Sequence, residues 1–216
     1  MHDILQCPNS LFCLAPSQRQ VALEGTPNKP AVGSLAEFVG IFRDLIEPVL
    51  AAQYFPKPPA TLIDIGSGGG SPAIPLRIVS PGISLVMVES KARKAAFLRE
   101  AVRQLKLNNV TVEASRFEEL LVRPELHELA DIATLRAVRV ERSLLDGIQA
   151  FLKPGGGLFL FRSGDPSGDR ALSTRFLQYE ASYVLLPHLQ SRLVVLRNVP
   201  QQHTTLSSLQ PSSSLP

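Results

Sequence analysis

The sequence is poor in cysteine: its 216 residues contain only Cys7 and Cys13. Neither belongs to a second pair, and no histidine follows at the spacing of a zinc site, which argues against a disulfide framework or a structural metal. We therefore expect both cysteines to be small buried apolar residues, and we predict no metal site.

Long apolar runs are also missing. A stretch such as residues 83–88 is far shorter than the ~20 residues that a membrane helix requires, and Met1-His2-Asp3 does not open a basic signal peptide. These absences predict a cytoplasmic protein with no membrane segment. A hydrophobic content of 44% in this length suits one principal domain with a small appendage. The formal charge of +3 permits a polyanionic partner without demanding one.

Composition and periodicity divide the chain into three predicted parts. Apolar residues recur at helical spacing over residues 35–55, although Pro48 is expected to kink or end that helix, so residues 1–58 are predicted to form a small N-terminal helical cap. Three prolines just before Ala60 mark the boundary with the main domain, residues 59–200. Residues 201–216 are rich in serine, glutamine and threonine, which predicts a disordered tail.

Within the main domain, strand-like and helix-like segments alternate. This order predicts an α/β fold, a doubly wound and mostly parallel sheet with helices on both faces. Two β-rich stretches near the end predict a terminal antiparallel hairpin. The predicted strands are 61–65, 84–89, 110–114, 131–135, 157–161, 181–186 and 192–199, and the predicted helices start at Pro72 or span 92–106 and 140–152.

A glycine-rich loop follows the first predicted strand. Gly66, Gly68 and Gly70 let the backbone turn and approach a ligand without a Cβ in the way. We expect Ser71 to cap the next helix and Pro72 to open it, so that helix amides face an anionic group. A dinucleotide site would need a glycine where Ser71 stands. The Gly-x-Gly-x-Gly spacing after an Asp-x pair instead resembles the loop of class I S-adenosylmethionine-dependent methyltransferases, with a turn that holds no ligand as the alternative.

The residues that follow the next strands are candidate ligand contacts, because ligands of doubly wound sheets lie at the carboxyl ends of the strands. Glu89 is predicted to accept hydrogen bonds from ribose hydroxyls, with a solvated surface acid as the alternative. Phe117 is predicted to offer an apolar face to adenine, and Glu118 or a backbone amide to meet the base edge, although the helix dipole alone favours acids at a helix start. Arg136 follows the fourth strand, at the mouth where a substrate must enter.

Together these motifs resemble the bacterial methyltransferases that modify N7 of a guanine in small-subunit ribosomal RNA, a family long called glucose-inhibited division protein B. The resemblance covers most of residues 60–164 and rests on segments 66–76, 88–90, 93–98, 115–119 and 136–137. Two segments depart from the family's pattern. Residues 38–45 lack its His and Asp-Ser motif, and Arg162-Ser163-Gly164 replaces its Lys-Gly.

The resemblance implies an S-adenosylmethionine-dependent rRNA (guanine-N7) methyltransferase. The implied partner is 16S rRNA or the small ribosomal subunit, and we expect the protein to act as a monomer. Carried over residue by residue, the family's cofactor contacts fall on Gly66, Ser71, Phe117, Glu118 and Arg136.

Guanine N7 has an exposed lone pair, so transfer of a methyl group needs alignment rather than a general base. Arg136 and Arg139 are therefore the predicted catalytic residues, holding phosphates near the mouth, with Arg162 behind them. The alternatives are a methyltransferase of the same fold that acts on a protein or small molecule, and a catalytically inert protein that binds S-adenosylmethionine.

The predicted helix over 92–106 has a basic face. Its apolar stripe, expected to be buried, consists of Ala95, Leu98, Val102 and Leu105. A solvated surface is the ordinary explanation of the cations, and contact with RNA phosphates, which would make the affinity fall steeply with salt, is the alternative. The cations are Lys91, Arg93, Lys94, Arg99, Arg103 and Lys106.

Overall fold

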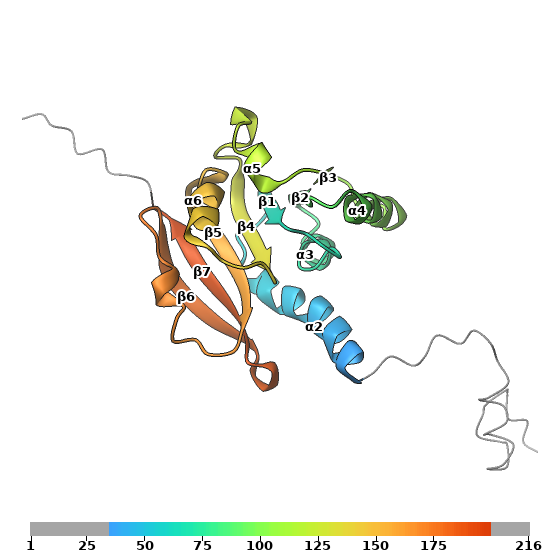
Figure 1. Cartoon of the computed structure of the whole chain (residues 1–216). Coiled ribbons are helices and arrows are strands. Elements are labelled where there is room, and N and C mark those ends of the chain that lie inside the picture. The colour runs from blue at the N-terminus through green and yellow to red at the C-terminus, as the bar shows by residue number, and fades with distance from the viewer. Residues whose placement is uncertain (1–34, 200–216) are drawn as a thin grey trace, which may run out of the picture. The chain divides into compact units, whose positions relative to one another are not determined.

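The computed structural model describes residues 35–199 and divides the chain into two compact units, residues 1–41 and 42–216. In the first unit, residues 35–41 form the beginning of helix α2 (Leu35–Ala51). The second unit contains the sheet and its remaining helices (Figure 1). Both cysteines, most of the predicted cap and the predicted tail lie outside the described residues. The domain boundaries therefore stay predictions.

Seven strands form one sheet, in the order β3-β2-β1-β4-β5-β7-β6. Strands β1 to β5 run parallel, whereas β7 is antiparallel to both of its neighbours, β5 and β6. The mostly parallel sheet and the terminal hairpin are thereby confirmed, and the last strand inserts beside β5, leaving β6 at the edge. The strands are β1 (Ala60–Ile65), β2 (Ile83–Val88), β3 (Val110–Glu113), β4 (Ala130–Arg136), β5 (Leu152–Ser163), β6 (Leu177–Leu186) and β7 (Ser191–Asn198).

The strand order reverses at β1. The chain moves outward from β1 to β2 and β3, and then returns to β4 on the other side of β1. Loops that leave β1 and β4 therefore diverge, which creates a crevice at the carboxyl ends of these two strands, the usual place of a ligand in this kind of sheet.

The helices agree with the predicted positions to within a few residues. In α4 the predicted apolar stripe is buried at Ala95 and Leu98 and partly buried at Val102, but Leu105 is 50% exposed because the helix ends at Gln104. The helices after α2 are α3 (Ala73–Val79), α4 (Ala92–Gln104), α5 (Phe117–Leu120) and α6 (Arg142–Gln149), and short 3-10 turns lie at Ala52–Tyr54, Pro124–Leu126, Arg170–Leu172 and Pro187–Leu189.

Two expectations concern helix ends, and one hydrogen bond bears on both. Of the two outcomes expected at Pro48, a kink or an end, the end is wrong, because helix α2 continues through Pro48 to Ala51. A proline has no amide hydrogen to donate to the carbonyl oxygen four residues earlier, which here belongs to Asp44. The hydroxyl of Ser71 donates to that oxygen at 2.7 Å, so the carbonyl is satisfied and the helix is not interrupted. Ser71 therefore makes no capping bond to α3, whose N-cap is Pro72.

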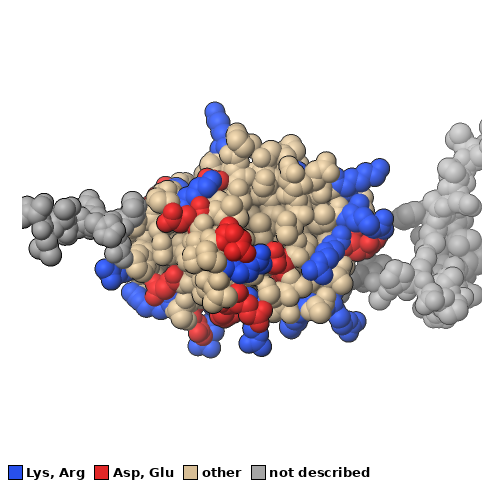
Figure 2. All heavy atoms as spheres, turned by 90° about the horizontal axis from the view of Figure 1, so that it is seen from above, with Lys and Arg blue, Asp and Glu red and all other residues tan. Residues whose placement is uncertain are grey.

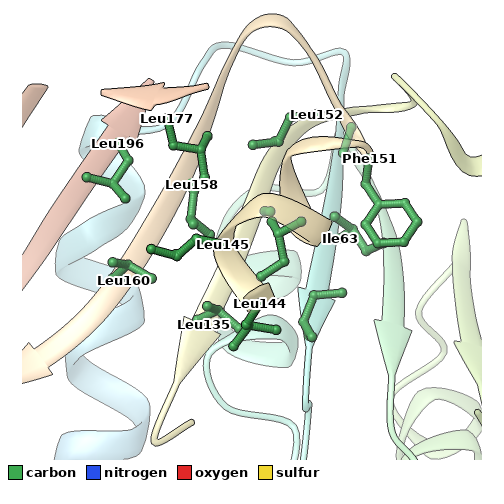
Figure 3. Close-up of a cluster of buried hydrophobic side chains, with 14 of the residues drawn as sticks. Ile63, Leu135, Leu144, Leu145, Phe151, Leu152, Leu158, Leu160, Leu177 and Leu196 are labelled. Carbon is green, nitrogen blue, oxygen red and sulfur yellow. The ribbon is translucent and has the colours of Figure 1, made fainter. Parts of the chain in front are cut away.

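Hydrophobic side chains on the strands alternate between the two faces of the sheet, as a strand's period of two requires. On β5, Leu158 and Leu160 belong to one buried cluster and Phe159 between them to another. The first cluster packs against α5 and α6, and Figure 3 shows Leu144 and Leu145 of α6 lying over the strands. The second includes residues of α2, α3 and α4. Within residues 35–199, helices thus pack against both faces of the sheet.

Candidate functional site

The glycine loop turns tightly over the end of β2. Gly66 has a φ of +76° and donates its amide to the carbonyl oxygen of Val88 at 2.9 Å. Gly70 serves packing: a Cβ at this position would lie 2.6 Å from Cδ1 of Ile74. Gly68 and Gly70 also have positive φ angles, so the turn favours glycine at all three positions, and Gly70 is needed in addition for close contact with α3.

Glu89 is only 6% exposed, so the alternative of a solvated surface acid is wrong. One carboxylate oxygen accepts from the amide of Gly68 at 2.9 Å, and the other accepts from the amide of Lys91 at 2.7 Å. The carboxylate thus ties the glycine loop to the start of α4. Each oxygen keeps a further lone pair, because a carboxylate has about four acceptor positions.

A cavity of about 600 Å³ opens at the carboxyl ends of β1, β2 and β4. It brings together four of the predicted site residues, Gly66, Phe117, Glu118 and Arg139. Gly68, Gly70, Ser71, Glu89 and Arg136 lie outside its lining. The other lining residues are Ile65, Val88, Ser90, Ser115, Arg116, Leu121, Val138, Glu141, Ser143 and Leu144.

Two lining features bear on what the cavity can hold. The buried hydroxyl oxygen of Ser115 has no hydrogen-bond partner among residues 35–199, so it is available to a polar atom of a ligand. The ring of Phe117 packs so closely on α6 that a Cβ on Gly147 would lie 2.8 Å from its Cε2 atom. Sequence reasoning missed Gly147, although a glycine inside a helical segment costs about 1 kcal/mol relative to alanine and is a recognisable signal.

Arg136 is held by acidic residues of α2. Its guanidinium lies 2.8 Å from a carboxylate oxygen of Asp44 and 2.8 Å from one of Glu47, and its side chain is only 9% exposed. Glu47, which is 1% exposed, also accepts from Arg43 at 2.8 Å. These two acids were not among the predicted site residues. The partner of a buried arginine depends on which helix packs over it, and local spacing carries no such information.

The other two arginines near the mouth have different surroundings. Arg139 is 90% exposed, lines the cavity and lies 3.3 Å from Glu141. Arg162 lies 3.3 Å from Asp169, a buried acid that also pairs with Arg192 at 2.6 Å. Of the two arginines predicted near the mouth and Arg162 predicted behind them, Arg139 alone is both exposed and part of the cavity lining.

Asp64 on β1 is a buried acid close to the loop. Burial raises its pKa from 3.8 to about 6, while the nearby hydroxyls of Thr134 and Ser67 and the charge of Arg136 oppose the rise. One carboxylate oxygen accepts from the Thr134 hydroxyl at 2.6 Å, and the other has no hydrogen-bond partner among residues 35–199, because the Ser67 hydroxyl donates to the backbone carbonyl oxygen of Asp64. Within residues 35–199 no group of three His, Cys, Asp or Glu side chains is placed to bind a metal, and no helix there is long and apolar enough to span a membrane.

The strand order, the single antiparallel strand and the glycine loop at the switch point define the fold of class I S-adenosylmethionine-dependent methyltransferases. A solved structure of this class, an S-adenosylmethionine-dependent methyltransferase from Aquifex aeolicus, shares the fold with a TM-score of 0.58. It is 15% identical, and the match covers 77% of this chain and 100% of that one. A profile of the family described as rRNA small subunit methyltransferase G matches residues 35–192, and the chain belongs to this family. The predicted family and fold class are confirmed, and S-adenosylmethionine is the cofactor that membership supports.

Several relatives carry the name ribosomal RNA small subunit methyltransferase G, and two of them illustrate the similarity. The one from Chloroflexus aggregans is 36% identical over 137 residues, which are 63% of this chain and 58% of that protein. The one from Carboxydothermus hydrogenoformans is 41% identical over 100 residues, which are 46% and 43% of the two chains. The chain thus spans about half the length of the curated relatives that it matches.

Proposed function

We propose that this chain transfers the methyl group of S-adenosylmethionine to N7 of a guanine in 16S ribosomal RNA. The observation that carries the proposal is the cavity at the switch point, lined by Gly66 and Phe117, in a chain of this family. The relatives' names specify RNA of the small ribosomal subunit. The acceptor atom, N7 of a guanine, is inferred from the resemblance of the sequence motifs to that family.

The residues around the cavity fit the parts of this cofactor. Its volume of about 600 Å³ lies in the usual range for small-molecule sites. Gly66, without a side chain, leaves room for the methionine part, and the ring of Phe117 offers an apolar face to adenine. The unpartnered Ser115 hydroxyl is available to the base edge. The remaining lone pairs of Glu89 suit ribose hydroxyls.

The reaction requires little proton chemistry from the protein. Bound S-adenosylmethionine supplies a methyl group on a sulfonium; a bond from N7 to the methyl carbon forms as the bond from carbon to sulfur breaks. Positive charge passes from sulfur to the purine, and N7 carries no proton that must first be removed. The protein therefore acts by aligning the nucleophile, the methyl carbon and the leaving sulfur.

The proposal gives the two arginines of the mouth different tasks. Arg139, exposed at the cavity, binds a phosphate of the substrate. Arg136 is already neutralised by Asp44 and Glu47, so we assign it to positioning: it fastens the end of β4 to α2 and thereby orients the loop that carries Arg139.

The test is methyl transfer by the purified full chain from labelled S-adenosylmethionine. The acceptors are small ribosomal subunits and naked 16S rRNA from cells that lack this protein, beside a protein and metabolite extract. We expect label in RNA, recovered as 7-methylguanosine after digestion. Label in protein or small molecules alone would contradict the proposal and indicate another substrate class. Binding of the cofactor in calorimetry with no transfer to any acceptor would indicate an inert binding protein.

A matched pair of variants tests the task of Arg139. Arg139→Gln is expected to raise the KM for RNA several-fold and to leave the dissociation constant of S-adenosylmethionine unchanged. Arg142→Gln removes an exposed cation from the next helix, outside the cavity lining, and should leave both quantities unchanged. Equal effects of the two substitutions would refute a specific phosphate contact at Arg139.

A further inference from the structure

The N-cap and first turn of α4 carry basic side chains that pair with no acid in the described part of the chain. Many cations of the described residues have an acidic partner, as Arg103 has Glu100 at 2.6 Å. Lys91, Arg93 and Lys94 are exposed and form no ion pair within residues 35–199. On the face seen in Figure 2, acidic and basic side chains lie close together over much of the surface, and basic ones predominate at the right-hand end, where α4 lies in Figure 1.

Helix stability does not explain these cations. Lys91 is the N-cap of α4, and the first turn of the helix contains no acidic residue. The helix dipole places positive charge at this end, so cations here are unfavourable. Three uncompensated cations at this position weaken the free helix, and a bound anion would reverse the effect.

An open groove runs beside the same three side chains. Its volume is about 690 Å³, and the ring of Phe97, which is 57% exposed, forms part of its wall. Flat aromatic rings that stack bases, combined with cations that bind the backbone, are what proteins use to hold single-stranded nucleic acid. The groove is lined by Gly68, Gly69, Lys91, Ala92, Arg93, Lys94 and Phe97.

The groove adjoins the cavity described above through shared segments. Gly66 and Ser90 line the cavity, while Gly68 and Lys91, each within two residues of them, line the groove. The carboxylate of Glu89 accepts from both Gly68 and Lys91 and joins these segments. A strand that lay in the groove would therefore reach the cavity with the next part of its backbone.

We infer that this groove holds a single-stranded segment of the RNA substrate. Its phosphates contact Lys91, Arg93 and Lys94, and an unpaired base stacks on Phe97. The inference rests on the proposed function, because it takes RNA to be the substrate. Single strands fit better than a duplex, whose stacked bases do not present their faces to a side chain.

The experiment measures binding of a labelled single-stranded RNA 20-mer that contains guanine, and of its duplex, by the full chain at several salt concentrations. The variant Lys91→Gln/Arg93→Gln/Lys94→Gln is expected to bind the single strand at least tenfold more weakly. Its slope of log affinity against log salt should be shallower by about 2, since each phosphate contact on a single strand contributes about 0.7. Phe97→Leu should weaken binding about tenfold with the slope unchanged, because it removes stacking and no charge.

A control variant removes three cations that do not line the groove, Lys57→Gln/Arg103→Gln/Arg197→Gln, for the same change in net charge. It should change the affinity less than twofold. Calorimetry with S-adenosylmethionine should give the same dissociation constant for every variant. Weaker binding of S-adenosylmethionine in the groove variants alone would contradict the inference, because the cations would then bind the cofactor and not RNA. Three other results would also overturn the inference. They are equal affinities for duplex and single-stranded RNA, displacement of the RNA by polyglutamate that carries the same total charge, and a salt slope of the triple variant equal to that of the wild type.

The same variants separate this inference from the proposed function. If the wild-type chain methylates 16S rRNA and the groove variant does so with an unchanged KM, the groove assignment fails and the proposed function stands. If the wild-type chain binds RNA through the groove and yet transfers no methyl group to any RNA, the proposed function fails and the groove assignment stands.

Discussion

Asp64 makes the stability of this protein depend on pH in an unusual direction. The side chain is 1% exposed, and burial raises its pKa from 3.8 to about 6. Between these two values the native state binds a proton at Asp64 that the unfolded chain has released. The free energy of unfolding therefore falls as the pH rises through this window. A difference of about 2 pKa units corresponds to a contribution of about 3 kcal/mol to the free energy of unfolding, and this contribution is lost as the pH rises above about 6.

The substitution Asp64→Asn removes the titration and nearly preserves the shape. The Thr134 hydroxyl can still donate to the amide oxygen, while the amide nitrogen takes the place of the oxygen that has no partner. That unsatisfied nitrogen lowers the stability by an amount that does not depend on pH. The quantity to measure is therefore how the difference in free energy of unfolding between the variant and the wild type changes with pH.

Urea unfolding of both proteins at pH values from 4 to 8 provides the measurement. Between pH 4 and pH 7, the free energy of unfolding of Asp64→Asn should rise by about 3 kcal/mol relative to that of the wild type. Asp131 serves as a control of opposite sign: although burial raises its pKa, hydrogen bonds from Lys153 and the Thr61 amide outweigh that effect and hold the pKa below its ordinary value. For this control the pH series is extended down to about 2, because the window of a lowered pKa lies at and below 3.8; as the pH rises through that window, Asp131→Asn should lose stability relative to the wild type. A difference for Asp64→Asn that stays constant within about 0.5 kcal/mol between pH 4 and pH 7 would refute the reasoning.

Three further substitutions test the packing of the site. Gly147→Ala should weaken binding of S-adenosylmethionine about tenfold in calorimetry, about 1.4 kcal/mol, because its Cβ displaces the Phe117 ring; unchanged affinity would contradict the placement of adenine on that ring. Gly70→Ala should lower the free energy of unfolding in urea by about 3 kcal/mol, since φ at this position is +94° and the added Cβ contacts Ile74. Gly69→Ala is the control: the added Cβ has open space around it, so the loss should be less than about 1 kcal/mol. Glu47→Gln leaves a buried arginine with one acidic partner and should lower the free energy of unfolding by about 3 kcal/mol; a loss below about 1 kcal/mol would argue against a tight ion cluster.

Much of the site could be predicted because its signals are local. Gly66 and Gly70 stand where the backbone adopts positive φ angles, and the position of Glu89 follows from the end of a strand. The roles of the site residues in binding and catalysis stay predictions. The surroundings of Arg136 could not be predicted, because they depend on a helix 92 residues away along the chain.

Strand positions, the mostly parallel sheet and the glycine loop were determined by the sequence alone, because hydrophobic periodicity and the need for glycine at a turn act over a few neighbouring residues. Tertiary structure decided the insertion of β7 beside β5, the neutralisation of Arg136 and the continuity of α2 through Pro48, where the Ser71 hydroxyl satisfies the carbonyl of Asp44. Each of these depends on a pairing between segments distant in the chain, about which the pattern of neighbouring residues carries no information.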